Sequence, residues 1–170
     1  MQQADHRHRG LLRVRQEEEL HQERHFSTRL VDMISTLALA DSRDELFRGL
    51  LDMSAELIEA TSGSLMLFDE HSQQLHIAVA KGMSPPLARS MAVPLGEGIA
   101  GRVARSGFPL LVNDIERDSR TATPNRPRFR TKSFISLPLR NGDRLVGVGY
   151  ADRLADSMSA IYFFYDPDLR

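Results

Sequence analysis

A glycine-rich stretch placed between a proline and a short apolar segment most constrains what this 170-residue chain can fold into. The stretch reads Pro94-Leu95-Gly96-Glu97-Gly98-Ile99-Ala100-Gly101. Glycine adopts backbone conformations and allows close approaches that other residues do not, so this spacing predicts a tight turn that enters a helix. As a bare pattern, Gly96-x-Gly98-x-x-Gly101 also matches the G-x-G-x-x-G motif of dinucleotide-binding proteins. The elements on either side of the glycines decide between the two interpretations.

Those elements argue against a dinucleotide site. Such a site needs a strand, the glycines, a crossover helix and a parallel strand. Here the preceding apolar run, Met91–Val93, is stopped by Pro94, and the helix predicted from Ile99 to Ser106 has only about two turns. A crossover between parallel strands takes about a dozen residues or more. We therefore interpret the three glycines as backbone hinges and do not expect an NAD-type enzyme.

The hydrophobic pattern predicts a helix followed by short strands. Ser42, with Glu45 three residues later, forms a capping box that starts a helix running to about Ala60. Later runs are short and are joined by hairpin-length links, which favours an α+β fold with an antiparallel sheet of about five to six strands. The predicted strands are Ser64–Phe68, Leu75–Ala80, Met91–Val93, Phe108–Val112, Phe134–Leu139 and Leu145–Tyr150, and residues 84–89 form one helical turn.

The N-terminal part of the chain predicts one long helix over residues 11–39, which contain neither proline nor glycine. Its second half carries a stripe at spacings of four and three: Phe26, Leu30, Met33, Leu37 and Ala40. This stripe either packs on the helix's own domain or pairs with a second copy in a homodimer. Both alternatives stay open, because Val31, Ile34 and Ala38 give the helix a second apolar side. The predicted division is a polar tail and helix at 1–40 and a domain at 41–170.

Composition excludes several classes of function. The chain has no cysteine, which rules out disulfides, thiol catalysis and thiolate metal sites. Its net charge of -1 predicts no general attraction to nucleic acid or to anionic membranes. No apolar run approaches the ~18–20 residues that cross a bilayer. We find no nucleophile–base pair, metal-ligand cluster or pair of acids, so no enzyme is expected. The composition fits a cytoplasmic protein.

The glycine stretch opens a longer series of spaced residues. The series is Pro94-Leu95-Gly96-Glu97-Gly98-Ile99-Ala100-Gly101-x-Val103, then Gly107-x-Pro109-x-x-Val112-x-Asp114, then Phe129-x-x-x-Ser133-Phe134-x-Ser136-x-Pro138-Leu139, and then Gly142-x-x-x-Val146-Gly147-Val148. From about residue 43 to residue 170 the chain resembles the GAF domain family. The resemblance implies a central antiparallel sheet with helices on both sides, as in PAS domains. It also implies a pocket between the sheet and residues 94–132.

The resemblance also implies which residues face that pocket. By position these are Ile99, Val103, Asp114, Phe129, Phe134, Ser136 and Tyr150. The loop at 116–132 holds six basic residues and two acidic ones. In it, Arg126, Arg128 and Arg130 can contact an anionic ligand, since arginine pairs with phosphate through two hydrogen bonds. The other interpretation, which we favour, is a solvated loop.

Ligand classes known in the family match this chain incompletely. Cyclic-nucleotide-binding members carry an Asn-Lys, Phe and Asp-Glu signature. The matching residues here are Tyr150-Ala151-Asp152-Arg153, Phe164 and Asp166-Pro167-Asp168, so Phe and Asp remain but Asn and Lys do not. Bilin-binding members and free-methionine-sulfoxide reductases use cysteines, which this chain lacks. A haem-binding member needs an axial histidine, and His71 and His76 lie on or beside the first predicted hairpin. The cofactor or ligand stays unidentified.

Members of this family usually sit in larger signalling proteins, among them two-component histidine kinases and transcriptional activators. The sequence therefore predicts a non-catalytic sensory or regulatory domain that binds a small molecule, forms a homodimer through the N-terminal helix, or does both. The alternative is a ligand-free dimerisation module. Asp166-Pro167-Asp168 is a helix start signal, so we expect a truncated final helix and a covalently linked output domain beyond residue 170. Direct nucleic-acid binding and membrane insertion are not expected.

Overall fold

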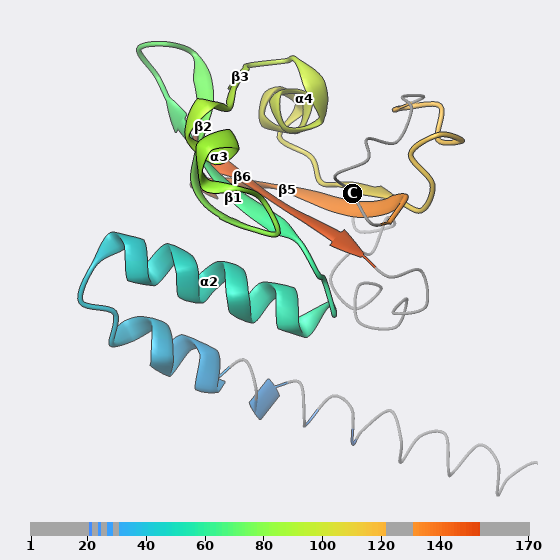
Figure 1. Ribbon diagram of the computed structural model, residues 1–170. Coiled ribbons are helices and arrows are strands. Elements are labelled where there is room, and N and C mark those ends of the chain that lie inside the picture. Colours follow the sequence, from blue (N-terminus) through green and yellow to red (C-terminus); the bar gives the residue numbers. More distant parts are fainter. Residues whose placement is uncertain (1–20, 22–23, 25–26, 29–30, 122–130, 154–170) are drawn as a thin grey trace, which may run out of the picture. The chain divides into compact units, whose positions relative to one another are not determined.

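The computed structural model describes residues 21, 24, 27–28, 31–121 and 131–153 (Figure 1). Residues 1–40 and residues 41–170 form two compact units. In the first unit residues 31–38 are helical, as are residues 21, 24, 27 and 28. The rest of the predicted helix at 11–39 lies outside the described residues, apart from Leu39, which forms a turn.

The first helix of the second unit, α2, spans Arg43–Leu57 and starts where the capping box predicts. The backbone N–H of Glu45 donates to Ser42 Oγ at 3.2 Å. In return, Glu45 Oε2 accepts from the backbone N–H of Asp41 at 3.1 Å, one residue before the expected partner. Two exposed N–H groups at the helix start are thereby satisfied. The helix ends three residues earlier than the sequence predicts.

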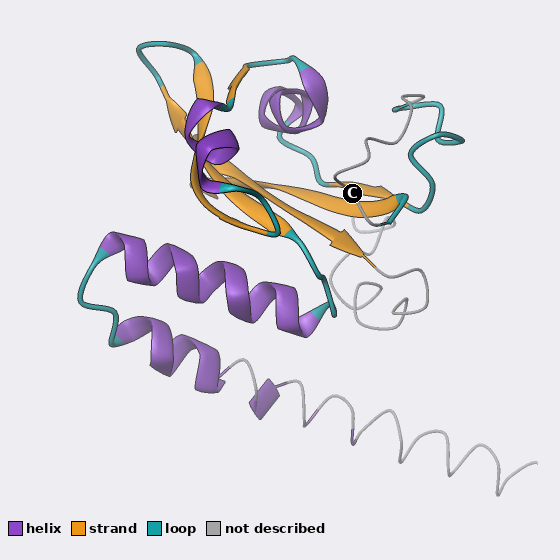
Figure 2. Ribbon diagram, in the orientation of Figure 1, coloured by secondary structure: helices purple, strands orange, loops and turns teal. Residues whose placement is uncertain are grey.

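A single six-stranded sheet forms the centre of this unit (Figure 2). Its spatial order is β3-β2-β1-β6-β5-β4, and every neighbouring pair is antiparallel. The strands are β1 Gly63–Asp69, β2 Gln74–Lys81, β3 Ala92–Pro94, β4 Leu110–Val112, β5 Ser133–Asn141 and β6 Arg144–Arg153. The predicted α+β class and antiparallel sheet are confirmed. Phe108 and Pro109 lie before β4, contrary to the predicted strand, and β6 runs further than predicted.

Helices cover both faces of the sheet, as Figure 1 shows for α2 and α4. Helix α2 packs on β1 and β2, while α4, at Gly98–Ser106, packs on β5 and β6. The short helix α3, at Pro85–Ser90, contacts β2. Under α4 lies a core of buried apolar side chains: Met66, Leu75, Val103, Ala104 and Val148. A second cluster joins Val112, Ile115 and Phe134.

The glycines act as the backbone hinges that the sequence predicts. Gly96 and Gly98 have φ angles of 89° and 56°, in the left-handed region that favours glycine. Gly101 lies where a Cβ atom would overlap the carbonyl oxygen of Pro94. This closeness lets the N–H of Gly96 donate to the carbonyl of Gly101 at 2.7 Å. Together with the nine-residue α4 and the antiparallel sheet, this geometry removes the basis for a dinucleotide site.

Candidate functional site

A cavity of about 580 Å³ lies between the sheet, α3 and α4; we name it the α3–α4 cavity. It is contained in the second unit, and its volume suits a small organic molecule. It is lined by Ser62–Ser64 and Met66 of the β1 region, Lys81 at the end of β2, residues 82–84 after it, Leu87 of α3, residues 91–93, residues 98–100 and Arg102 of α4, Ile115, and Tyr150 of β6.

The structure brings two of the predicted pocket residues, Ile99 and Tyr150, to the wall of this cavity. Val103 and Phe134 are each only 2% exposed and belong to the two apolar clusters. Asp114 accepts a hydrogen bond from the backbone N–H of Glu116 at 2.9 Å and is not among the lining residues. Phe129, Arg126, Arg128 and Arg130 lie outside the described residues.

Ser136 has an unusual environment. It is fully buried in β5, and its hydroxyl has no hydrogen-bond partner among the described residues. Its register partner on β6 is Tyr150, and the register partner of Tyr150 on β1 is Ser64. Directly paired residues share a face of the sheet, so these three hydroxyl side chains form one row across the strands. Two members of the row, Ser64 and Tyr150, line the α3–α4 cavity.

The cavity combines apolar walls with a cationic edge. Three methionines, at 66, 83 and 91, line it together with Leu87, Val93 and Ile99, and methionine packs adaptably against varied shapes. Its charged lining residues are Lys81 and Arg102, and no aspartate or glutamate is among them. Lys81 forms an ion pair with Asp52 of α2 at 3.2 Å. Arg102, by contrast, forms hydrogen bonds with backbone carbonyl oxygens.

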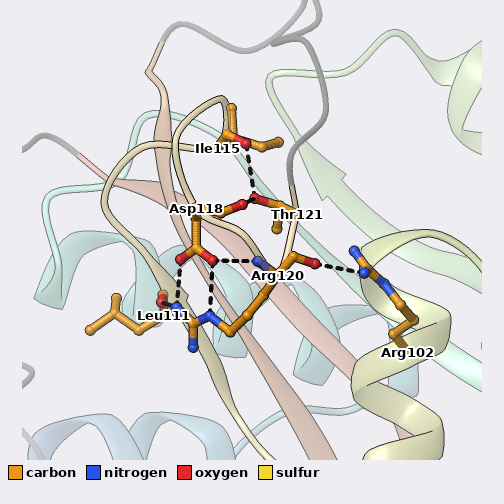
Figure 3. Close-up of polar contacts among 6 residues, drawn as sticks. All are labelled: Arg102, Leu111, Ile115, Asp118, Arg120 and Thr121. Atoms are coloured by element: carbon orange, nitrogen blue, oxygen red, sulfur yellow. Dashed lines mark hydrogen bonds and ion pairs between the residues drawn. The ribbon is translucent and has the colours of Figure 1, made fainter.

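Arg102 connects α4 to the loop after β4 (Figure 3). Its Nε donates to the carbonyl of Gly98 at 2.9 Å, and its Nη1 donates to the carbonyl of Arg120 at 2.7 Å. Arg120 in turn donates to Asp118 and to the carbonyl of Leu111 in β4. The Arg120 guanidinium is the main reason that the pKa of Asp118 lies below its usual value. The loop that supplies Ile115 to the cavity wall is thus attached to α4 and to the sheet.

A buried carboxylate accepts a hydrogen bond from Ser62, which lines the cavity. Asp152, near the end of β6, is fully buried. Its Oδ1 accepts from the backbone N–H groups of Thr61 and Ser62 at 3.0 and 2.7 Å, and its Oδ2 accepts from the Thr61 hydroxyl at 3.2 Å. The N–H of Asp152 donates to the carbonyl of Ser62 at 3.0 Å. The sequence analysis missed this role, because the partners lie about 90 residues apart in the chain.

Within the part of the chain that the structure describes, no group of three or more His, Asp or Glu could hold a metal ion. His71 is exposed in the hairpin turn and His76 is exposed in β2, and neither lines the α3–α4 cavity. None of the described helices is long and apolar enough to cross a membrane.

Comparison with known proteins places this geometry in a family. The GAF domain family model matches residues 40–151. The chain is 30% identical over 113 residues to the nitrogen fixation protein VnfA of Azotobacter vinelandii, and 27% identical over 126 residues to the Nif-specific regulatory protein of Azospirillum lipoferum. These matches cover 64% and 72% of this chain but only 22% and 19% of the two relatives. The chain therefore spans about a fifth of their length.

Solved structures share the fold at low sequence identity. The GAF domain of a phosphoenolpyruvate-protein phosphotransferase from Coxiella burnetii matches with a TM-score of 0.66 at 18% identity, covering 75% of this chain and 76% of that one. The free methionine-R-sulfoxide reductase of Neisseria meningitidis, solved with its substrate, matches with a TM-score of 0.63 at 20% identity, covering 79% and 77%. One of these neighbours is an enzyme, so the fold alone does not decide whether a chain is catalytic.

Proposed function

The chain belongs to the GAF domain family, and we propose that it is a non-catalytic sensory or regulatory domain of a larger cytoplasmic signalling protein. It binds a small molecule in the α3–α4 cavity and controls an output domain in the same polypeptide. Residues 41–170 form the sensory domain, and residues 1–40 carry the helix through which two copies pair. The name of the Azospirillum lipoferum relative, a regulatory protein, supports the regulatory part of this proposal.

The observation that carries the proposal is the cavity itself. Its volume of about 580 Å³ lies in the range of roughly 300–1,000 Å³ that is usual for small-molecule sites. Apolar walls with a few polar groups are the usual composition of small-molecule sites. The cavity also touches Ser62, which Asp152 holds, so a bound molecule would bear on the junction between α2, β1 and the end of β6.

Blocking the cavity is expected to abolish ligand-dependent stabilisation. Ala92 lines the cavity and is exposed, so Ala92→Trp would place an indole at its mouth without repacking the core. A metabolite at 100 times its Kd stabilises a folded protein by about 2.7 kcal/mol, or roughly 5–10 °C in Tm for a chain of this size. We expect thermal-shift screening of a metabolite library to give such a shift for the wild type and none for the variant.

Leu137→Trp is the matched control, because Leu137 is 40% exposed and does not line the cavity. This variant should retain the full shift. A screen in which no metabolite stabilises the wild type, or one in which Ala92→Trp responds as the wild type does, contradicts ligand binding in the cavity and leaves the ligand-free dimerisation module.

The first unit supports the pairing of two copies. The apolar side chains of Val31 and Ile34, three residues apart on the helix, are 62% and 65% exposed. Exposed apolar side chains along one helix side are typical of a surface that is covered by a partner helix. The half-buried residues Met33 and Leu37 belong to the predicted stripe. A second copy of the same helix provides matching apolar surface by symmetry.

Ile34→Glu is expected to weaken the dimer on the order of 100-fold, since two charged side chains would enter one interface at a cost of about 2.7 kcal/mol. Light scattering across a dilution series measures the change. Thr36→Glu adds the same charge at an exposed position on the opposite side of the helix from Val31 and Ile34, so it should leave the dimer intact. A wild-type chain that stays monomeric at high micromolar concentration would exclude the pairing.

A further inference from the structure

We propose that the α3–α4 cavity selects a monoanionic amphipathic molecule, in which one carboxylate binds Arg102 and an apolar body fills the rest of the cavity. The inference rests on the proposed function, because it names the class of ligand for the same cavity. It is carried by the charge of the lining residues, by the hydrogen bonds that Arg102 makes, and by the chemistry of the walls.

Arg102 lines the cavity and has no counter-ion among the residues that the structure describes. Both of its hydrogen bonds go to backbone carbonyl oxygens, those of Gly98 and Arg120, and no described acidic side chain forms an ion pair with it (Figure 3). A guanidinium has five N–H donors. The two bonds engage one donor on Nε and one on Nη1, which leaves three N–H groups, one on Nη1 and two on Nη2, for a ligand. A carboxylate fits this planar arrangement and forms strong charge-assisted hydrogen bonds with it.

The charge balance of the cavity favours one negative charge on the ligand. Lys81 is the other lining cation, and Asp52 already pairs with it. A second negative charge on a ligand would therefore enter the cavity without a partner, which costs free energy unless it is compensated. Residues 98–100 at the start of α4 also line the cavity, and the partial positive charge of a helix N-terminus adds to the attraction for a single anion.

The walls determine the remainder of the molecule. Beyond the start of α4 the cavity is lined by Met66, Met91, Val93 and Ile99, and residues of this kind favour an aromatic or branched apolar body. A small acid without such a body would satisfy Arg102 but leave the apolar walls empty. The ligand class therefore requires both parts, and each part can be removed separately in an experiment.

The test compares three compounds by isothermal titration calorimetry at neutral pH: 3-phenylpropanoate, its amide 3-phenylpropanamide, and propanoate. The amide keeps the apolar body without the charge, and propanoate keeps the charge without the ring. We expect the wild type to bind 3-phenylpropanoate on the order of tenfold or more tightly than either, since a hydrogen bond to a charged group contributes about 1.5–3 kcal/mol.

Arg102→Gln should lower the affinity for 3-phenylpropanoate on the order of tenfold and leave that for the amide nearly unchanged. Arg105→Gln is the matched control. Arg105 lies on the same helix, also donates to a backbone carbonyl, that of Leu95 at 2.8 Å, and does not line the cavity. Its loss removes the same charge from the same helix, so it should leave both affinities as they are.

Several results would overturn the inference. Equal affinities for the acid and the amide, an unchanged affinity in Arg102→Gln, or no binding of 3-phenylpropanoate to the wild type each exclude the carboxylate class. The metabolite screen with Ala92→Trp decides separately whether the cavity binds a ligand at all. A neutral metabolite that stabilises the wild type but not Ala92→Trp would therefore contradict this inference and leave the proposed function intact.

Discussion

Replacing Asp152 with alanine is expected to lower the free energy of unfolding by about 2–4 kcal/mol, since it removes three partly buried hydrogen bonds to a carboxylate, and one hydrogen bond to a charged group contributes about 1.5–3 kcal/mol. In the wild type the N–H groups of Thr61 and Ser62 and the Thr61 hydroxyl all donate to the Asp152 carboxylate, and the substitution removes this acceptor. Because these donors connect the end of α2 and the start of β1 to β6, the loss acts on three elements at once. Urea denaturation followed by circular dichroism measures it.

Asp152→Asn separates the hydrogen bonds from the loss of a side chain. The amide oxygen can still accept from the two backbone N–H groups, and the amide nitrogen can donate to the Thr61 hydroxyl, which also accepts. We expect a loss of only about 1 kcal/mol, the net value of a typical hydrogen bond. If alanine were tolerated as well as asparagine, the proposed attachment of β6 to the α2–β1 junction would be wrong.

Gly147→Ala is expected to destabilise the protein by about 2–4 kcal/mol, because overpacking that shifts backbone is among the costly kinds of substitution. A Cβ atom at this position in β6 would overlap the carbonyl oxygen of Met66 and would lie 3.2 Å from the Cα atom of Leu67. Both are backbone atoms of the neighbouring strand β1, which cannot rotate away as a flexible side chain can. The pairing of the two central strands would have to open.

Gly149→Ala provides the control two residues along the same strand. A Cβ atom at Gly149 would meet nothing within 4 Å. Alanine there should be neutral or should stabilise the protein by up to about 1 kcal/mol, because it restricts the unfolded chain. The two substitutions are chemically identical, so the sign of their difference depends only on the packing of β6 against β1. Similar unfolding free energies for both variants would contradict the described register.

Local chemistry made much of the fold predictable from the sequence. The Ser42–Glu45 pair predicts the start of α2, because a capping box satisfies backbone groups within four residues. The glycines predict a turn into a short helix, because positive φ at Gly96 and Gly98 is a property of single residues. Alternating apolar residues predict the strands, and short links between them predict antiparallel pairing.

The site was less accessible to the same reasoning, because its members come from distant parts of the chain. Ile99 and Tyr150 could be assigned to the cavity from their places in the family pattern. Position in a pattern does not reveal which way a side chain faces, and so Val103 was expected in the pocket but lies in the core. Its neighbour Arg102 was not predicted as a cavity residue. Adjacent side chains on a helix point about 100° apart, so Arg102 reaches the cavity while Val103 faces the core.

What the sequence determined by itself is therefore the local order of turns, helix ends and strands, together with the family, since each depends on residues close together in the chain. Only the tertiary structure decided that Asp152 attaches β6 to Thr61 and Ser62, and that Arg102 lines a cavity with two carbonyl partners and, among the described residues, no carboxylate. Both facts depend on contacts made across the sheet. The free energy of burying a charge is set by those contacts, and no local pattern records them.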